Sequence, residues 1–210
     1  MPRARHTVGA AFVLLLLVLS PRAASAQPLA PEPPGGLTFD IRGTTLGVPQ
    51  TSDFYPDLPT DTIVPARGFG LEGGVQVYPW RHGSRSLGLG ADLFWTRASA
   101  TPTITAPDAT GVVTGIALRD VAVTTLVMSP QVSINFGSAA GWSYLTVGGG
   151  GAWVRSTAAQ DEKSRAVADV NAGAGARWFL TDHVGVGFDL RMHWYGGSSL
   201  FAASAGFSLK

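Results

Sequence analysis

Apolar and polar residues alternate with a period of two in eight separate segments of this chain, and helical periodicity is absent throughout. In the first segment, Leu37, Phe39 and Ile41 fall on one face. Asp40 and Arg42 fall on the other. The phase is less clear in the fourth segment and in the fifth, which a run of four glycines interrupts. The predicted strands are residues 37–45, 68–78, 87–97, 119–135, 142–154, 168–180, 184–194 and 200–209.

The polar face of these segments has an unusual composition. It consists mostly of Gly, Ala, Ser and Thr, and the 210-residue chain contains only two lysines and 14% charged residues. A strand face in contact with water normally carries Lys and Glu, and soluble domains contain about 25% charged residues. The polar face therefore suits a narrow lumen, with the apolar face turned toward lipid. In lipid every backbone N–H and C=O needs a partner, so the strands must close into a ring. The sequence predicts an all-β fold, an eight-stranded antiparallel up-and-down transmembrane β-barrel over residues 37–210.

The first 26 residues have the three regions of a secretory signal peptide. Arg3 and Arg5 form a basic start, residues 8–19 are apolar, and residues 24–26 read Ala-Ser-Ala. Cleavage before Gln27 would leave a proline-rich lead-in, residues 27–36, ahead of the barrel. It would also remove three of the 15 basic residues and leave 12 against 14 acidic ones, a net charge of −2. No basic surplus then points to nucleic acid, and the absence of cysteine excludes disulfides and thiolate chemistry.

The connections between the predicted strands alternate in length. Segments 46–67, 98–118 and 155–167 are long, whereas 79–86, 136–141 and 181–183 are short and 195–199 is a short exception among the long ones. Barrels of the bacterial outer membrane have long external loops and tight periplasmic turns. This pattern therefore predicts a location in the bacterial outer membrane, with both termini in the periplasm.

All six tryptophans lie near the ends of predicted strands. Trp belongs at a membrane interface because its ring is apolar while its N–H needs a polar partner. The alternative is a set of core tryptophans in a soluble sandwich, but core residues need not prefer strand ends. The predicted aromatic girdle comprises Trp80, Trp95, Trp142, Trp153, Trp178 and Trp194.

The charged residues on the polar face are nearly balanced in sign, as a poorly hydrated interior requires. We expect them to pair across strands and brace the lumen, because an eight-stranded barrel is just wide enough for side chains to fill. The alternative role is an ion path or gate. The predicted lumen network comprises Asp40, Arg42, Glu72, Asp92, Arg119, Asp169, Arg177, Asp189, Arg191 and His193.

Other motifs give weak signals for chemistry. The glycine runs 148–151 and 173–175 do not join a strand to a helix, as a phosphate-binding loop requires. Asp53, Asp57 and Asp61 match no dense calcium loop, and a solvated acidic loop is the better interpretation. No catalytic residue, cofactor or metal is predicted.

One hairpin carries a resemblance to a known family. Residues 171–191, NAGAGARWFLTDHVGVGFDLR, resemble the hairpin of strands 6 and 7 in small eight-stranded outer-membrane barrels. This group includes the opacity-type porins and the membrane domain of OmpA-like proteins, and the resemblance extends over residues 37–210. It implies recognition of the last strand by the barrel-assembly machinery. Phe207 and Leu209 keep the alternation of that strand, although the chain ends on Lys210. Since residues 37–210 are taken up by the predicted barrel, we expect no peptidoglycan-binding domain of the OmpA-like kind.

A second resemblance concerns function. Outer-membrane lipid A deacylases also use an eight-stranded barrel, with a Ser–His–acid site that faces lipid. His193 is followed by Ser198 and Ser199, which is not the spacing of those enzymes, and its phase points inward. We therefore expect a non-enzymatic integral outer-membrane barrel that serves envelope integrity or surface interaction through its outer loops. A lipid-modifying enzyme and a narrow channel are the alternatives. The expected partners are membrane lipid, lipopolysaccharide and the assembly machinery, with the chain itself a monomer.

Overall fold

The computed structural model describes residues 36–58, 63–101, 103–107, 113–117 and 120–210. The predicted signal peptide, most of the lead-in and Arg119 lie outside the described residues. None of the described residues belongs to a helix that is long and apolar enough to cross a membrane.

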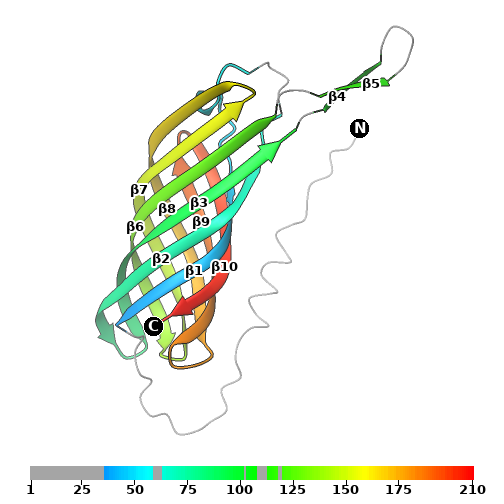
Figure 1. Cartoon of the computed structure of the whole chain (residues 1–210). Coiled ribbons are helices and arrows are strands. Elements are labelled where there is room, and N and C mark those ends of the chain that lie inside the picture. Colours follow the sequence, from blue (N-terminus) through cyan, green and yellow to red (C-terminus); the bar gives the residue numbers. More distant parts are fainter. Residues whose placement is uncertain (1–35, 59–62, 102, 108–112, 118–119) are drawn as a thin grey trace, which may run out of the picture. The chain divides into compact units, whose positions relative to one another are not determined.

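Eight strands form a closed antiparallel barrel, which confirms the predicted fold class (Figure 1). Around the ring the order is β1, β10, β9, β8, β7, β6, β3 and β2, so each of these strands pairs with its neighbours along the chain. The first and last strands close the ring, with Phe39 opposite Leu209. The strands are β1 (Leu37–Gly47), β2 (Arg67–His82), β3 (Arg85–Ala100), β6 (Val121–Ser138), β7 (Gly141–Ala158), β8 (Asp161–Phe179), β9 (Val184–Tyr195) and β10 (Ser198–Leu209).

Side chains alternate between the lumen and the outside along every barrel strand. In β1, Ile41 is 62% exposed, whereas Asp40 and Arg42 on either side of it are 2% and 1% exposed. This arrangement is the reverse of a soluble barrel, whose apolar side chains face inward. So large an apolar exterior is stable in lipid and not in water. The chain is therefore a membrane barrel with its polar face inside.

The two ends of the barrel differ in their connections. At one end lie the start of β1, the end of β10 and three tight turns. The backbone N–H of Lys210 donates to the carbonyl of His183 there, and the N–H of Gly137 donates to the carbonyl of Ser84. The opposite end carries residues 48–58 and 63–66, the end of β3, the start of β6 and the turns after β7 and β9. We call the first end the terminal end and the second the loop end.

Two predicted loops contain strands. Within 98–118, β4 (Thr103–Pro107) pairs with β5 (Val113–Ala117) as a separate two-stranded sheet. The prediction of a loop over 155–167 is wrong, because β7 and β8 stay paired as far as Ala158 and Asp161. Only Ala159 and Gln160 form the turn, with Ala159 in the left-handed region at φ 57°. Charged residues on both faces of 155–165 interrupt the apolar alternation, although Ala158 is buried in the apolar cluster of the lumen.

Candidate functional site

An aromatic layer fills the lumen at the terminal end. The ring of Trp142 stacks on Phe179 at 5.0 Å and meets the edge of Tyr78 at 5.7 Å between centroids. Trp142 is only 2% exposed, so its assignment to the aromatic girdle is wrong. It shares the inward face of Tyr144, because residues two apart on a strand point to the same side. The other five tryptophans are 42–54% exposed on the outer face.

Asp40 on β1 is the centre of the first charged layer. Arg177 on β8 donates from Nε to its carboxylate at 3.0 Å, and Arg42 lies 2.9 Å from Oδ1. Arg42 also donates to Glu72 at 2.9 Å, and Ser208 donates to Asp40. Two strands separate β1 from β8 around the ring, so the Arg177–Asp40 pair reaches across the lumen.

Arg191 on β9 forms a second brace. One of its Nη atoms lies 2.8 Å from Asp92 on β3 and 3.1 Å from Asp189 on its own strand. Strands β9 and β3 are four positions apart in the eight-stranded ring, so this pair joins opposite walls. Each carboxylate also accepts a hydrogen bond from a neutral side chain. Gln131 donates to Asp92 at 2.6 Å, and Tyr144 donates to Asp189 at 2.9 Å. The brace therefore ties several strands together at mid-height.

His193 and Asp169 form the third layer. The Nδ1 atom of His193 lies 3.1 Å from Oδ2 of Asp169, and Asn171 donates to the same carboxylate at 2.7 Å. The imidazole packs edge-on against Phe94, with centroids 5.1 Å apart. Ser199 lies on the opposite face, since it pairs with the outward Trp194. The His193 ring is thus held by an acid and an aromatic ring, and Ser199 does not share its side of the sheet.

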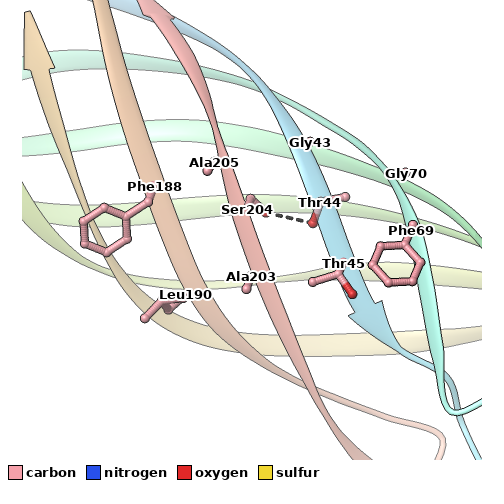
Figure 2. Close-up of a pocket in the computed structure, with 10 residues that line it drawn as sticks. All are labelled: Gly43, Thr44, Thr45, Phe69, Gly70, Phe188, Leu190, Ala203, Ser204 and Ala205. Carbon is pink, nitrogen blue, oxygen red and sulfur yellow. Dashed lines mark hydrogen bonds between the residues drawn. The ribbon is translucent and has the colours of Figure 1, made fainter. Parts of the chain in front are cut away.

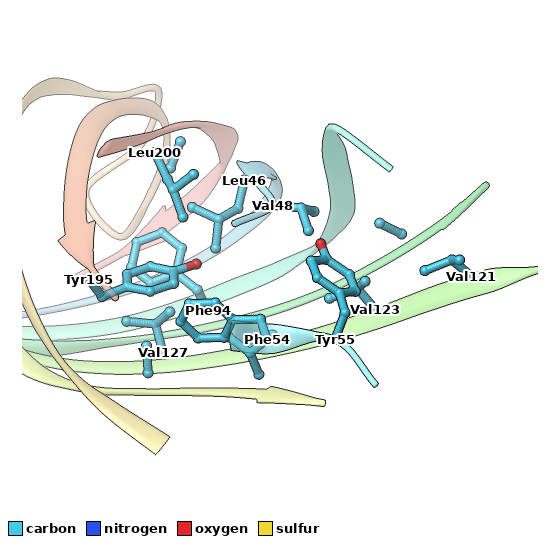
Figure 3. Close-up of a cluster of buried hydrophobic side chains, with 14 of the residues drawn as sticks. Leu46, Val48, Phe54, Tyr55, Phe94, Val121, Val123, Val127, Tyr195 and Leu200 are labelled. Carbon is cyan, nitrogen blue, oxygen red and sulfur yellow. The ribbon is translucent and has the colours of Figure 1, made fainter. Parts of the chain in front are cut away.

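Between His193 and the loop end, the side chains that line the lumen are mostly apolar. A segment of the first loop fills this part of the lumen (Figure 3). The short 3-10 helix η1 (Ser52–Phe54) places Phe54, which is fully buried, in a cluster with Phe94 and Leu46. Ser156 on β7 donates to the carbonyl of Phe54. We call residues 48–55 the plug segment.

Two further contacts hold the plug segment. Arg165 lies 2.7 Å from Asp53, and its guanidinium covers the Phe54 ring at 5.2 Å. The hydrogen bond and charge of Arg165 lower the pKa of the exposed Asp53 carboxyl. The Tyr55 hydroxyl donates to the carbonyl of Pro49 at 2.6 Å, and burial raises the pKa of Tyr55 to about 12. The loop end is therefore closed by part of the chain itself.

The structure places nine of the ten predicted lumen residues inside the barrel, each 0–3% exposed; Arg119 lies outside the described residues. The sequence did not predict the neutral side chains that donate to the lumen carboxylates, namely Gln131, Tyr144 and Asn171. The inward face of their strands was uncertain or carried few charges. The plug was not predicted either. The aromatic pair Phe54-Tyr55 in this predicted loop was the available signal.

The interior of the barrel contains ion pairs that reach across the lumen, beneath an apolar plug. Among the described residues, no group of three or more His, Asp or Glu side chains is placed to hold a metal ion. The charges form pairs that span the barrel, and the apolar plug covers them. Such a network can hold the walls together and exclude water.

The sequence matches no protein-family model and no curated protein. Solved structures do match. The attachment invasion locus protein Ail of Yersinia pestis is 11% identical, with a TM-score of 0.54, over 84% of this chain and 98% of that one. The same protein in complex with the heparin analogue sucrose octasulfate is 12% identical over the same shares, also with a TM-score of 0.54. The chain has the fold of a small outer-membrane β-barrel.

Neisserial surface protein A also matches, at 12% identity and a TM-score of 0.49, over 84% of this chain and 97% of that one. At such identities the similarity concerns the fold.

Proposed function

We propose that this chain is a non-enzymatic integral protein of the bacterial outer membrane that acts through the surface at its loop end. In this orientation the loop end is outside the cell and both termini are periplasmic, as is typical of such barrels. The observation that carries the proposal is the sealed lumen. Arg42, Arg177 and Arg191 are each only 1% exposed, although guanidinium groups in a water-filled pore would be hydrated.

The shape of the loop-end rim supports a role at the cell surface. Strands β6, β7 and β8 have 18 or 19 residues, whereas β1 and β9 have 11 and 12, so the wall formed by β6, β7 and β8 extends beyond β1 and β9. The tip of this wall is charged, with Arg155 and Glu162 paired at 2.6 Å and Lys163 beside them. Binding commonly resides on segments that a rigid scaffold presents in this way. We call residues 155–164 the β7–β8 tip.

The partners follow from the same proposal. Outward side chains contact membrane lipid and lipopolysaccharide. The alternating apolar residues of β10, ending in Phe207 and Leu209, suit recognition by the barrel-assembly machinery. The barrel is complete in one chain, which favours a monomer. Nothing in the net charge favours nucleic acid.

Planar-bilayer recording and lipid A mass spectrometry test the proposal together. We expect no discrete conductance steps from the wild-type protein, and an unchanged lipid A mass when it is expressed in cells. His193→Ala should leave that mass unchanged too. Stepwise conductance would establish a channel instead, and a lipid A product that disappears with His193→Ala would establish an enzyme.

A second experiment addresses the surface role. Replacing residues 157–162 with a two-residue Asn-Gly turn shortens the β7–β8 tip within its existing register. Cells that carry the wild-type, shortened or no protein are compared for adhesion to epithelial monolayers and for uptake of a hydrophobic dye. Loss of adhesion with normal dye exclusion in the shortened variant supports surface interaction. Identical adhesion in all three strains contradicts it.

A further inference from the structure

A groove runs along the outside of the barrel across β9, β10, β1 and β2 (Figure 2). Its volume is about 560 Å³, within the range of ligand pockets, which is about 300–1,000 Å³. Small outward residues form its floor, namely Gly43 and Thr45 on β1 and Ala203 and Ala205 on β10. The groove lies on the face that contacts lipid.

The strand register produces this shape. Gly43 lies opposite Ala205, and Thr45 lies opposite Ala203, so four small residues are contiguous. The neighbouring strands carry bulky residues at the same height. Figure 2 shows Phe188 and Leu190 on one side of the floor and Phe69 on the other. Beneath the floor, Ser204 donates to Thr44 at 2.7 Å in the lumen and ties the two strands together. The groove is therefore built into the barrel wall.

Arg67 lies over the end of the groove nearer the loop end. It extends from β2 across β1, where its Nη1 lies 3.4 Å from the Thr45 hydroxyl. Its guanidinium covers the ring of Phe201 on β10, 5.8 Å from the centroid. Both of these contacts are to neutral groups, so they leave the charge of Arg67 uncompensated.

A second arginine stands next to the first. Arg97 on β3 pairs with Phe69, which is two residues from Arg67 on the same outward face of β2. Diagonal neighbours on a sheet lie about 7–8 Å apart, a distance that long side chains can bridge. Arg67 itself turns toward β1 and β10, so Arg97 adds a second positive charge on the opposite side of Phe69.

We propose that this surface binds one phosphorylated glycolipid of the outer leaflet, such as lipid A. An acyl chain occupies the groove, and a phosphate is bound by Arg67, with Arg97 as a neighbouring positive charge. Charge complementarity selects this ligand, because guanidinium groups bind phosphate through paired hydrogen bonds and an apolar channel leads directly away from them. The inference rests on the orientation in the proposed function, which puts this rim in the outer leaflet.

Native mass spectrometry of the full-length protein tests the site. The purified barrel in detergent is titrated with lipid A, with dephosphorylated lipid A, and with phosphatidylethanolamine. We expect one lipid A per barrel and at least about tenfold weaker binding of the other two lipids, as expected for a lost charge-assisted hydrogen bond. Arg67→Gln should weaken lipid A binding to the same degree and Arg97→Gln to a smaller degree, whereas Arg85→Gln at the terminal end should not.

A pair of glycine variants tests the groove independently of charge. A Cβ atom at Gly43 meets nothing closer than the Ala205 carbonyl at 3.9 Å, so Gly43→Leu fills the groove without a clash. A Cβ at Gly73, also on the outer face, meets nothing within 4 Å, so Gly73→Leu is the matched control. We expect Gly43→Leu to abolish lipid A binding and Gly73→Leu to preserve it.

Equal binding in all variants, or equal binding of the three lipids, would overturn the proposal. A dimer that Gly43→Leu dissociates would also overturn it and assign the groove to a second copy of the chain. The mobility of unheated protein on a gel shows in every case that the barrel is folded. The outcome is separate from that of the proposed function, because it depends neither on adhesion nor on conductance.

Discussion

Replacing Arg191 with Met removes the cation that joins opposite walls of the lumen. Asp92 and Asp189 would then remain buried, 3% and 1% exposed, without their shared positive charge. Breaking a buried pair in this way typically costs about 3–5 kcal/mol. Both carboxylates keep one neutral donor, Gln131 or Tyr144, so we expect the lower end, about 3 kcal/mol of unfolding free energy.

The control is Arg155→Met in the β7–β8 tip. Arg155 pairs with Glu162, but the two side chains are 62% and 45% exposed, and such surface pairs contribute about 0–1 kcal/mol. Urea unfolding in lipid vesicles, followed by gel mobility, measures both variants. A third variant, Arg191→Met with Asp92→Asn and Asp189→Asn, should recover most of the loss, because no buried charge remains unpaired. Equal destabilisation by Arg191→Met and Arg155→Met would refute the bracing role of the lumen network.

Three further predictions concern folding, topology and the plug segment. Unheated protein should migrate faster in SDS than boiled protein, because a closed barrel resists the detergent; identical mobility would contradict closure. A protease site inserted after Gln160 should be cut on intact cells, whereas one after Asp182 should not, and the reverse pattern would invert the barrel. Arg165 lowers the pKa of Asp53, so their contact is fully present above the unfolded value of about 4 and is lost as pH falls through the lower folded value. Hydrogen exchange of the Phe54 and Tyr55 amides, corrected for intrinsic rates, should therefore stay constant from about pH 8 to 5 and accelerate below about pH 4; acceleration near pH 6 would point to another group.

The barrel could be predicted from the sequence because lipid imposes a pattern on every residue. Alternation in β1 fixes which side chains face outward, and the need to pair every backbone group then requires closure. Strand ends beyond the membrane were harder to predict. There the hairpin of β7 and β8 continues with charged residues on both faces, so hydrophobic alternation disappears while the hydrogen-bonded ladder remains.

In the lumen, too, some features could be predicted from the sequence and others could not. Charged lumen residues such as Asp40 and Arg177 could be recognised from their phase, because a charge opposite a lipid-facing residue must lie inside. Their partners could not, since the Arg177–Asp40 contact depends on how strands separated by 137 residues curl toward each other. The plug depends on a loop folding back onto Phe94, which no periodicity encodes. Trp142 shows a further limit, because position near a strand end does not determine which face a side chain occupies.

Methyl NMR of the protein in lipid nanodiscs tests the inside-out arrangement most directly and needs no substitution. Ala202 is 1% exposed in the lumen, whereas its neighbours Ala203 and Ala205 lie on the floor of the outer groove. A lipid with a paramagnetic group in its acyl chain should broaden the methyl signals of Ala203, Ala205 and Ile41. It should leave Ala202 and Val127 sharp. Broadening of Ala202 and Val127 with sharp signals from Ala203 and Ile41 would show that the barrel faces are reversed.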